Sequence, residues 1–291
     1  MRTSGGQGSV VPVTVVVLVI LVIWYIAAIL MNAVIAQPKI DAAGGGLANM
    51  LGVSWGLDRP IVPAPHQILA EIWKTVFLVA PWKVKSLVYH VWVTLSSTLL
   101  GFALGTLLGI GLAIAIVHFK LLNKSLMPWI IASQTIPILA IAPMIIVVLG
   151  SLGLTGILPK SIISMYLCFF PVTIGMVKGL TSPDPMQLDL MRTYYASPWQ
   201  ILWKLRFPAS LPFLFASLKV AIAIALTGAI VGELPTGAQA GIGARMLAGS
   251  YYGQTIQIWA ALVAASCAAA SLVYAVGGIE GLVGRRMGAR P

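Results

Sequence analysis

The chain has 291 residues, of which 59% are hydrophobic and only 9% are charged. An ordinary soluble domain is about 25% charged, so this composition excludes one, and a mean hydropathy of +0.98 indicates a membrane protein. The formal net charge of +11 does not indicate nucleic-acid binding, because the cations lie between apolar runs and not in one patch.

Six apolar runs predict membrane-spanning helices, since a hydrocarbon core about 30 Å thick needs roughly 20 apolar residues. The first run is too long for the core of a signal peptide, so we expect it to be retained. The predicted spans are residues 11–36, 90–117, 126–149, 162–177, 211–231 and 256–283. The fold class that follows is an all-α membrane protein with about six transmembrane helices.

Six spans place both termini on one side of the membrane. Outside the long segment 37–89, most cations fall on the side of the termini, among them Arg2, Lys120 and Lys178. Long loops count least in the positive-inside rule, so the sequence predicts that both termini are cytoplasmic.

The long segment 37–89 contains "IVPAPHQILAEIWKTVFL", in which apolar residues recur at helical spacing after two prolines. This pattern predicts an amphipathic helix at the outer interface, leading into the second span. Within that span, Gly101, Gly105 and Gly109 lie four residues apart, which is typical of a surface that another helix packs against closely.

Several kinds of chemistry are missing from the sequence. There is no GxxxxGK[ST] run, so the chain cannot be its own ATPase, and there is no HExxH motif. Cys168 and Cys267 lie in apolar runs without metal-ligand spacing and are interpreted as small buried hydrophobes. Glu233 and Glu280 sit only at the edges of spans, which argues against an ion-driven carrier. We expect no catalytic residue, no metal site and no cofactor bound by this chain.

One stretch differs from its apolar surroundings, "RTYYASPWQILWKLRFPASLP" from Arg192 to Pro212. Ser197, Pro198 and Gln200 predict a helix start with a capping box, and we expect Pro208 to end this helix. A short helix over residues 185–194 is expected before it. A folded inner loop with exposed aromatic and charged side chains is typical of a docking surface; the alternative is a segment anchored in lipid headgroups.

This stretch resembles the cytoplasmic signature loop of permease subunits of ABC importers, whose pattern is EAA, three residues, Gly, nine residues, then I-x-L-P. Asp189-Leu190-Met191 stands at EAA, Tyr195 at the glycine, and Leu205-Arg206-Phe207-Pro208 at I-x-L-P. If the glycine position needs a left-handed backbone, tyrosine costs about 1–2 kcal/mol, and we expect a reshaped turn. The docking residues that the resemblance implies are Asp189, Arg192, Tyr194, Tyr195, Ala196, Ser197, Trp199 and Pro208.

The resemblance extends over nearly the whole chain and is closest to the branch that imports nitrate, taurine, aliphatic sulfonates and pyrimidine-type thiamine precursors. The pieces that carry it are "VPAPHQIL", "QTIPILAIAPMIIVVLG", "CFFPVTIGMVKGL" and "GELPTGAQAGIGARM", in the same order as in that branch. It implies a type I ABC importer permease fold in a bacterial cytoplasmic (inner) membrane. It also implies four kinds of partner: two ATP-binding subunits that hold ATP and Mg, a second permease copy or paralogue, an extracytoplasmic substrate-binding protein, and the lipid bilayer.

The expected organisation has four parts. Residues 1–36 form an N-terminal segment with the first span, and residues 37–89 an outer loop with an amphipathic helix. Residues 90–284 form a core permease domain with a coupling loop at 183–210, and residues 285–291 a basic cytoplasmic tail. Candidates for lining the translocation pathway are the polar or kinked mid-span positions Gln134, Thr135, Pro137, Phe170 and Pro171.

The sequence thus predicts a permease subunit that couples ATP hydrolysis in partner chains to import of a small organic or anionic solute. The alternatives are an ion-coupled secondary carrier and a membrane assembly factor. A secondary carrier typically has inverted repeats and mid-span acids, and an assembly factor does not need a folded inner loop.

Overall fold

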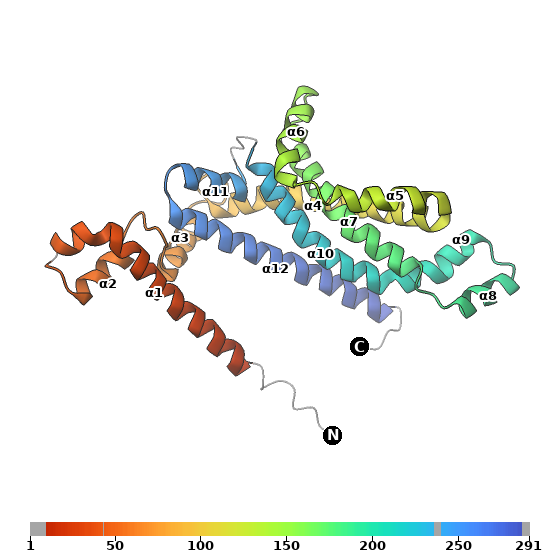
Figure 1. Ribbon diagram of the computed structural model, residues 1–291, viewed down its shortest axis with the longest axis horizontal. Helices are drawn as coiled ribbons and strands as arrows, with labels where there is room; N and C mark the ends of the chain where they lie inside the picture. The colour runs from red at the N-terminus through yellow and green to blue at the C-terminus, as the bar shows by residue number, and fades with distance from the viewer. Residues whose placement is uncertain (1–9, 43, 236–239, 287–291) are drawn as a thin grey trace, which may run out of the picture. The chain divides into compact units, whose positions relative to one another are not determined.

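The computed structural model describes residues 10–42, 44–235 and 240–286, and across these ranges every regular element is a helix (Figure 1). Arg2, residues 287–291 of the basic tail and residues 236–239 lie outside the described part. The helices are α1 (Val10–Ala42), α2 (Leu47–Trp55), α3 (Pro65–Phe77), α4 (Leu87–His118), α5 (Lys120–Ser133), α6 (Ile138–Ser151), α7 (Ile157–Leu180), α8 (Pro185–Thr193), α9 (Pro198–Ile201), the π-helical turn η1 (Leu202–Arg206), α10 (Phe207–Glu233), α11 (Ile242–Tyr251) and α12 (Thr255–Arg286).

Within the described ranges, five helical stretches are long and apolar enough to span a membrane: α1, α4, α7, the run Pro198–Glu233 that contains α10, and α12. The prediction of an all-α membrane protein is confirmed. The predicted third span over 126–149 corresponds to α5 and α6, which are bent by 99° where they meet; counted as one broken span, the pair is the sixth candidate within the described ranges. Pro137 explains the break: it disfavours helical backbone at the residue before it and has no N–H to continue the ladder, and it serves as the N-cap of α6.

The chain divides into two compact units. The N-terminal unit comprises Met1–Val88 and Arg245–Val263, and the core unit comprises Tyr89–Ala244 and Ala264–Pro291. Each unit is held together by its own polar and apolar contacts, described in turn below.

Asn32 organises the N-terminal unit. Its side chain is fully buried, donates to the carbonyls of Ser54 and Val62, and accepts from the backbone N–H groups of Ile61 and Val62. A buried side-chain amide whose oxygen and nitrogen are both hydrogen-bonded fixes the positions of the segments that it contacts. Asn32 therefore joins α1 to α2 and to the segment that leads into α3.

Helix α3 forms where the sequence predicts an amphipathic helix. Pro65 is its first residue, and the Gln67 side chain accepts from the Ala64 N–H at 3.0 Å, in the manner of a capping box. Ile68 is buried, whereas Leu69, Trp73 and Phe77 form an exposed apolar row at four-residue spacing. The predicted location of this row at the outer membrane interface stays a prediction.

Arg245 of α11 connects α3 to the segment that leads into α4. It is buried, donates to the Lys85 carbonyl at 3.0 Å, and its guanidinium lies 3.5 Å from the Glu71 carboxylate. Burial lowers the pKa of Arg245, and the charge of Glu71 opposes that shift.

Helix α7 is the centre of the core unit and packs between α4 and α10 (Figure 1). The predicted glycine stripe of α4 packs on it: a Cβ at Gly109 would lie 2.9 Å from both the Phe169 carbonyl and Val172. On the other side, a Cβ at Gly228 of α10 would lie 2.9 Å from the Ser164 backbone. Small residues thus allow three helices to approach closely.

The two cysteines differ. Cys168 is buried between α4 and α7, as its apolar surroundings predict, but Cys267 is exposed on α12. The expectation that both are buried is wrong for Cys267, because the apolar surface of a membrane helix faces outward as well as inward.

Candidate functional site

Helices α8 and α9 form a compact projection at one end of the core unit (Figure 1). Asp184 caps α8 by accepting from the Met186 N–H at 2.8 Å, and Pro185 follows as its first residue. Ser197 accepts from the Gln200 N–H at 3.3 Å, and Gln200 accepts from the Ser197 N–H at 2.8 Å. The predicted capping box is confirmed, so the segment is folded.

Tyr195 ends α8 in a left-handed backbone conformation, with φ of 51°, and is the one non-glycine residue at positive φ within the described ranges. The Ala196 N–H bonds the Met191 carbonyl at 3.1 Å and the Tyr195 N–H bonds the Arg192 carbonyl at 2.9 Å. These two bonds define a Schellman motif, in which glycine normally occupies the position of Tyr195. The expectation of a reshaped turn is therefore wrong, because this turn keeps the left-handed conformation with tyrosine in it.

Pro208 does not end the helix that begins at Pro198, contrary to the prediction. The π-helical turn η1 widens the helix just before Pro208, with the Phe207 N–H bonding the Leu202 carbonyl five residues back. In an ordinary α-helical turn the ring of Pro208 would clash with the backbone carbonyl four residues before it, and Pro208 has no N–H to donate to that carbonyl. The wider π-helical turn avoids this clash. The helix therefore continues from α9 through η1 into α10.

The projection is fixed to the rest of the core unit at three points. Leu202 is fully buried in a cluster with Met176 and Leu180, and the Arg206 side chain donates to the Leu180 carbonyl at 3.2 Å. The rings of Trp199 and His118, the last residue of α4, lie 5.6 Å apart. Its position is therefore set by α4, α7 and α10 together.

The outer surface of the projection is aromatic and apolar. Tyr195 is 96% exposed, and Tyr194 and Trp199 are also largely exposed. Asp189 and Arg192 form an exposed ion pair at 3.0 Å on α8. Such a surface on a rigid support is typical of a binding interface.

None of the five positions predicted to line a pathway lines the cavity described below. Gln134, Thr135 and Pro137 lie at the break between α5 and α6, with Thr135 exposed. Phe170 and Pro171 lie within α7, and Phe170 packs against a cluster that includes Ile116 and Ile130.

A buried polar cluster around Glu233 was missed by sequence reasoning, which placed this residue at the edge of a span. Glu233 is fully buried and accepts from the Thr94 hydroxyl at 2.9 Å and from the Gly243 N–H at 2.8 Å. Lys160 lies 3.9 Å from its carboxylate and donates to the Ala240 carbonyl at 3.2 Å. The signal was the acid followed by Gly-x-Gly, since Gly241 packs so closely on the Glu233 carboxylate that a Cβ would overlap it.

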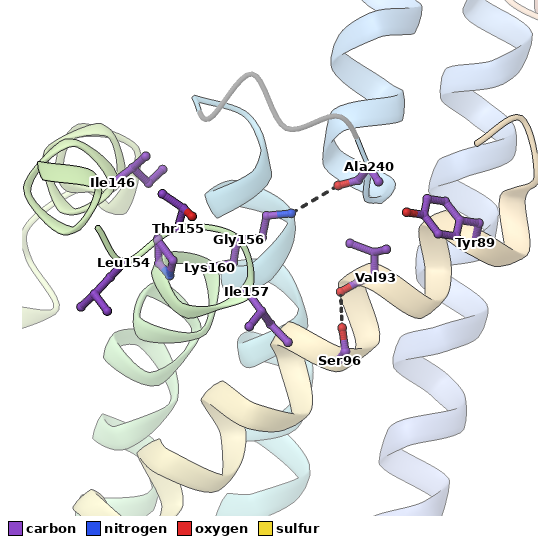
Figure 2. A pocket seen from close by; sticks show the side chains of 12 residues that line it. Tyr89, Val93, Ser96, Ile146, Leu154, Thr155, Gly156, Ile157, Lys160 and Ala240 are labelled. Atoms are coloured by element: carbon purple, nitrogen blue, oxygen red, sulfur yellow. Dashed lines mark hydrogen bonds between the residues drawn. The ribbon is translucent and has the colours of Figure 1, made fainter. Parts of the chain in front are cut away.

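Next to this cluster is a cavity of about 400 Å³ between α4, α6 and the start of α7 (Figure 2). Its walls are mainly apolar, with the hydroxyls of Tyr89, Ser96 and Thr155 and the amine of Lys160 among them. Burial of a charged amine beside an apolar cavity is a feature of binding sites.

Comparison with known proteins identifies the family. Residues 105–289 match the family described as the binding-protein-dependent transport system inner membrane component. A probable ABC transporter permease protein of Haemophilus influenzae is 32% identical over 203 residues, which cover 70% of this chain and 78% of that protein. The riboflavin transport system permease protein RibX of Chloroflexus aurantiacus is 31% identical over 184 residues, which cover 63% of this chain and 65% of that protein. The formylaminopyrimidine transport permease protein ThiX of Halalkalibacterium halodurans is 30% identical over 194 residues, which cover 67% of this chain and 75% of that protein.

The family match covers more than half of the chain, including α7, the projection of α8 and α9, Glu233 with Lys160, and α12. A helical fold with several membrane-spanning stretches fits a membrane transport subunit. The chain belongs to this family: it is a multi-pass permease subunit of a binding-protein-dependent ABC importer, in the branch that includes nitrate, aliphatic sulfonate and formylaminopyrimidine permeases.

Proposed function

We propose that this chain lines the membrane pathway of an ATP-driven importer and that its loop at 183–210 docks onto an ATP-binding subunit. The exposed aromatic surface of Tyr194, Tyr195 and Trp199 is the observation that carries the proposal. The caps at Asp184 and Ser197 hold this surface in one shape, so little conformational entropy is lost when a partner binds it.

The contacts of the projection explain how a partner's motion reaches the membrane helices. Trp199 contacts the end of α4, and Leu202 and Arg206 contact the end of α7. Since η1 continues into α10, movement of the projection moves three spans as one body. The chain contributes no catalytic residue in this scheme, and ATP and Mg bind to the partner subunit.

The assembly we propose has two ATP-binding subunits, a second copy or paralogue of this chain, and an extracytoplasmic substrate-binding protein. The projection and both termini face the cytoplasm, and the segment 37–89 with α3 faces the other side. The solute is a small organic or anionic molecule, in keeping with the names of the relatives.

Gln134, Thr135 and Pro137 are retained as proposed pathway positions because they lie at a break within an apolar stretch. Non-helical backbone at membrane depth is tolerated only where protein or water covers it. Phe170 and Pro171 are proposed as pathway positions on the neighbouring helix α7.

The test is reconstitution of this chain with the proposed ATP-binding subunit and substrate-binding protein. We expect solute uptake into proteoliposomes that requires ATP and stops when the ATP-binding subunit is omitted. Uptake driven by a proton or sodium gradient without that subunit would instead establish an ion-coupled carrier.

A further inference from the structure

The cavity beside Lys160 lies at the end of the core unit opposite to the docking projection. Helix α4 links the two sites: Val93 lines the cavity, and His118 at the other end of α4 contacts Trp199. Between these residues the helix extends about 37 Å at 1.5 Å per residue, which exceeds the thickness of a hydrocarbon core. On the proposed function, the cavity therefore faces the side from which solute arrives.

The cavity has the size and lining of a ligand site. Its volume of about 400 Å³ lies within the roughly 300–1,000 Å³ that small-molecule sites occupy. Val93, Ile146 and Ile157 provide apolar walls from three different helices. These walls favour a ligand with an apolar ring or chain, since a bare inorganic ion leaves them unfilled.

Lys160 gives the cavity its polarity. The side chain is more than nine-tenths buried, and of its three N–H donors one bonds the Ala240 carbonyl while the Glu233 carboxylate lies at the longer distance of 3.9 Å. In Figure 2 the Tyr89 hydroxyl points from α4 toward the same region. None of the described residues that line the cavity is acidic. A hydrogen-bond acceptor suits this lining, because the Lys160 amine can donate to it, whereas a cation finds no acidic residue among the described residues that line the cavity.

We propose that this cavity is a solute-binding site of the membrane subunit itself, and that it takes small organic molecules that combine an apolar ring or chain with a carboxylate, sulfonate or carbonyl acceptor directed at Lys160. The proposal rests on the proposed function and specifies the class of solute that the importer accepts.

Gly150 of α6 provides the variant that tests it. It lines the cavity, and a Cβ at this position meets no atom within 4 Å, so a leucine side chain here starts from open space at the cavity wall and should reduce the cavity volume. Gly111 of α4 is equally open but does not line the cavity, and Gly111→Leu is the matched control. Lys160→Met is a poorer test, because it leaves the buried Glu233 without its cation and can prevent folding.

The measurement is the binding of benzoate, butanesulfonate and benzylammonium to the full-length chain in lipid nanodiscs by titration calorimetry. We expect benzoate or butanesulfonate to bind and benzylammonium not to bind. Gly150→Leu should weaken binding at least about tenfold, with Gly111→Leu unchanged. Equal affinity of both variants, or binding of benzylammonium in place of the two anions, overturns the proposal. Binding requires no ATP, so this result is independent of the uptake experiment that tests the proposed function.

Discussion

Lys219 of α10 and Glu280 of α12 form an ion pair between two helices that are apolar enough to span a membrane. Their side chains are 37% and 35% exposed, so neither charge is enclosed by the core unit alone. Charged residues in membrane spans usually pair and face protein or water, because an isolated charge in hydrocarbon is costly. Pairing thus allows each charge to remain within an apolar helix.

We expect that removing either partner destabilises the core unit more than removing both. Lys219→Met leaves Glu280 unpaired and Glu280→Gln leaves Lys219 unpaired, each at a cost of about 1–3 kcal/mol. The double variant, which carries no charge at this position, should recover most of that loss. The measurement is the unfolding temperature in lipid nanodiscs, and additive losses in the double variant would show that the pair does not act as a unit.

Two glycines of α4 offer a direct test of helix packing. Gly109→Ala places a methyl group 2.9 Å from the Phe169 carbonyl and Val172, while Gly111→Ala meets open space. Overpacking costs about 1–3 kcal/mol, and replacing a helical glycine by alanine otherwise gains up to about 1 kcal/mol. Gly109→Ala should therefore lower the free energy of unfolding and Gly111→Ala should not, as measured by reversible unfolding in mixed micelles. Equal stability of the two variants would contradict the observed packing of α4 on α7.

Thr94 connects α4 to the segment after α10. Its hydroxyl donates to Glu233 and accepts from the Ile242 N–H at 2.8 Å, all in a fully buried position. Thr94→Val removes the hydrogen-bond acceptor of the Ile242 N–H and one of the donors to Glu233, and should cost about 1–3 kcal/mol. Hydrogen exchange should become faster at the Ile242 amide in this variant.

Thr94→Ser is the matched control for that experiment, because it keeps the hydroxyl and removes only a methyl group. Its exchange at Ile242 should stay close to that of the unchanged chain. Faster exchange in both variants would attribute the effect to lost packing and not to the hydrogen bonds.

The sequence predicted the helices and the caps because these depend on local chemistry. The apolar runs predicted the spans, and Ser197 with Gln200 predicted the start of α9, since a capping box involves residues only three apart. The glycine stripe of α4 likewise predicted close packing, although its partner α7 became visible only in the structure.

The errors arose where a local rule competed with a contact from a distant segment. Proline normally ends a helix, but the buried Leu202 and the hydrogen bond from Arg206 to Leu180 hold the chain in a π-helical turn that accommodates Pro208. Glu233 looked like the polar edge of a span, because Thr94 and Lys160, which satisfy it, are more than seventy residues away in sequence. The Gly-x-Gly after Glu233 is a local sign of close packing, but no local pattern identifies its distant partners Thr94 and Lys160.

The proposed orientation predicts opposite labelling of two exposed positions. Leu47 of α2 belongs to the segment assigned to the outer side, and Met186 of α8 to the cytoplasmic projection, and both side chains are largely exposed. In a Cys267→Ser background, an impermeant thiol reagent added outside cells should modify Leu47→Cys and not Met186→Cys. Permeabilised cells supply the control, in which both should react; outside labelling of Met186→Cys in intact cells would reverse the orientation.

Substitutions at Tyr195 can distinguish an effect on stability from an effect on docking. Its left-handed backbone carries strain, while its ring is 96% exposed. Tyr195→Gly relieves the strain and should stabilise the chain by about 1 kcal/mol, whereas Tyr195→Ala keeps the strain. Both variants lose the ring, and loss of an aromatic anchor commonly costs an interface about 2 kcal/mol or more. Both should therefore retain less ATP-binding subunit on co-purification, even though only Tyr195→Gly unfolds at a higher temperature.

Arg192→Ala is the matched control for this loss of docking. Its exposed ion pair with Asp189 is worth only about 0–1 kcal/mol, so this variant should retain more ATP-binding subunit and more solute-stimulated ATP hydrolysis than either Tyr195 variant. If all three variants keep full association and full coupled hydrolysis, the projection only anchors the chain in lipid headgroups. A stronger loss for Arg192→Ala than for Tyr195→Ala would instead assign the interface to charge, and would exclude the aromatic surface as its main source of affinity.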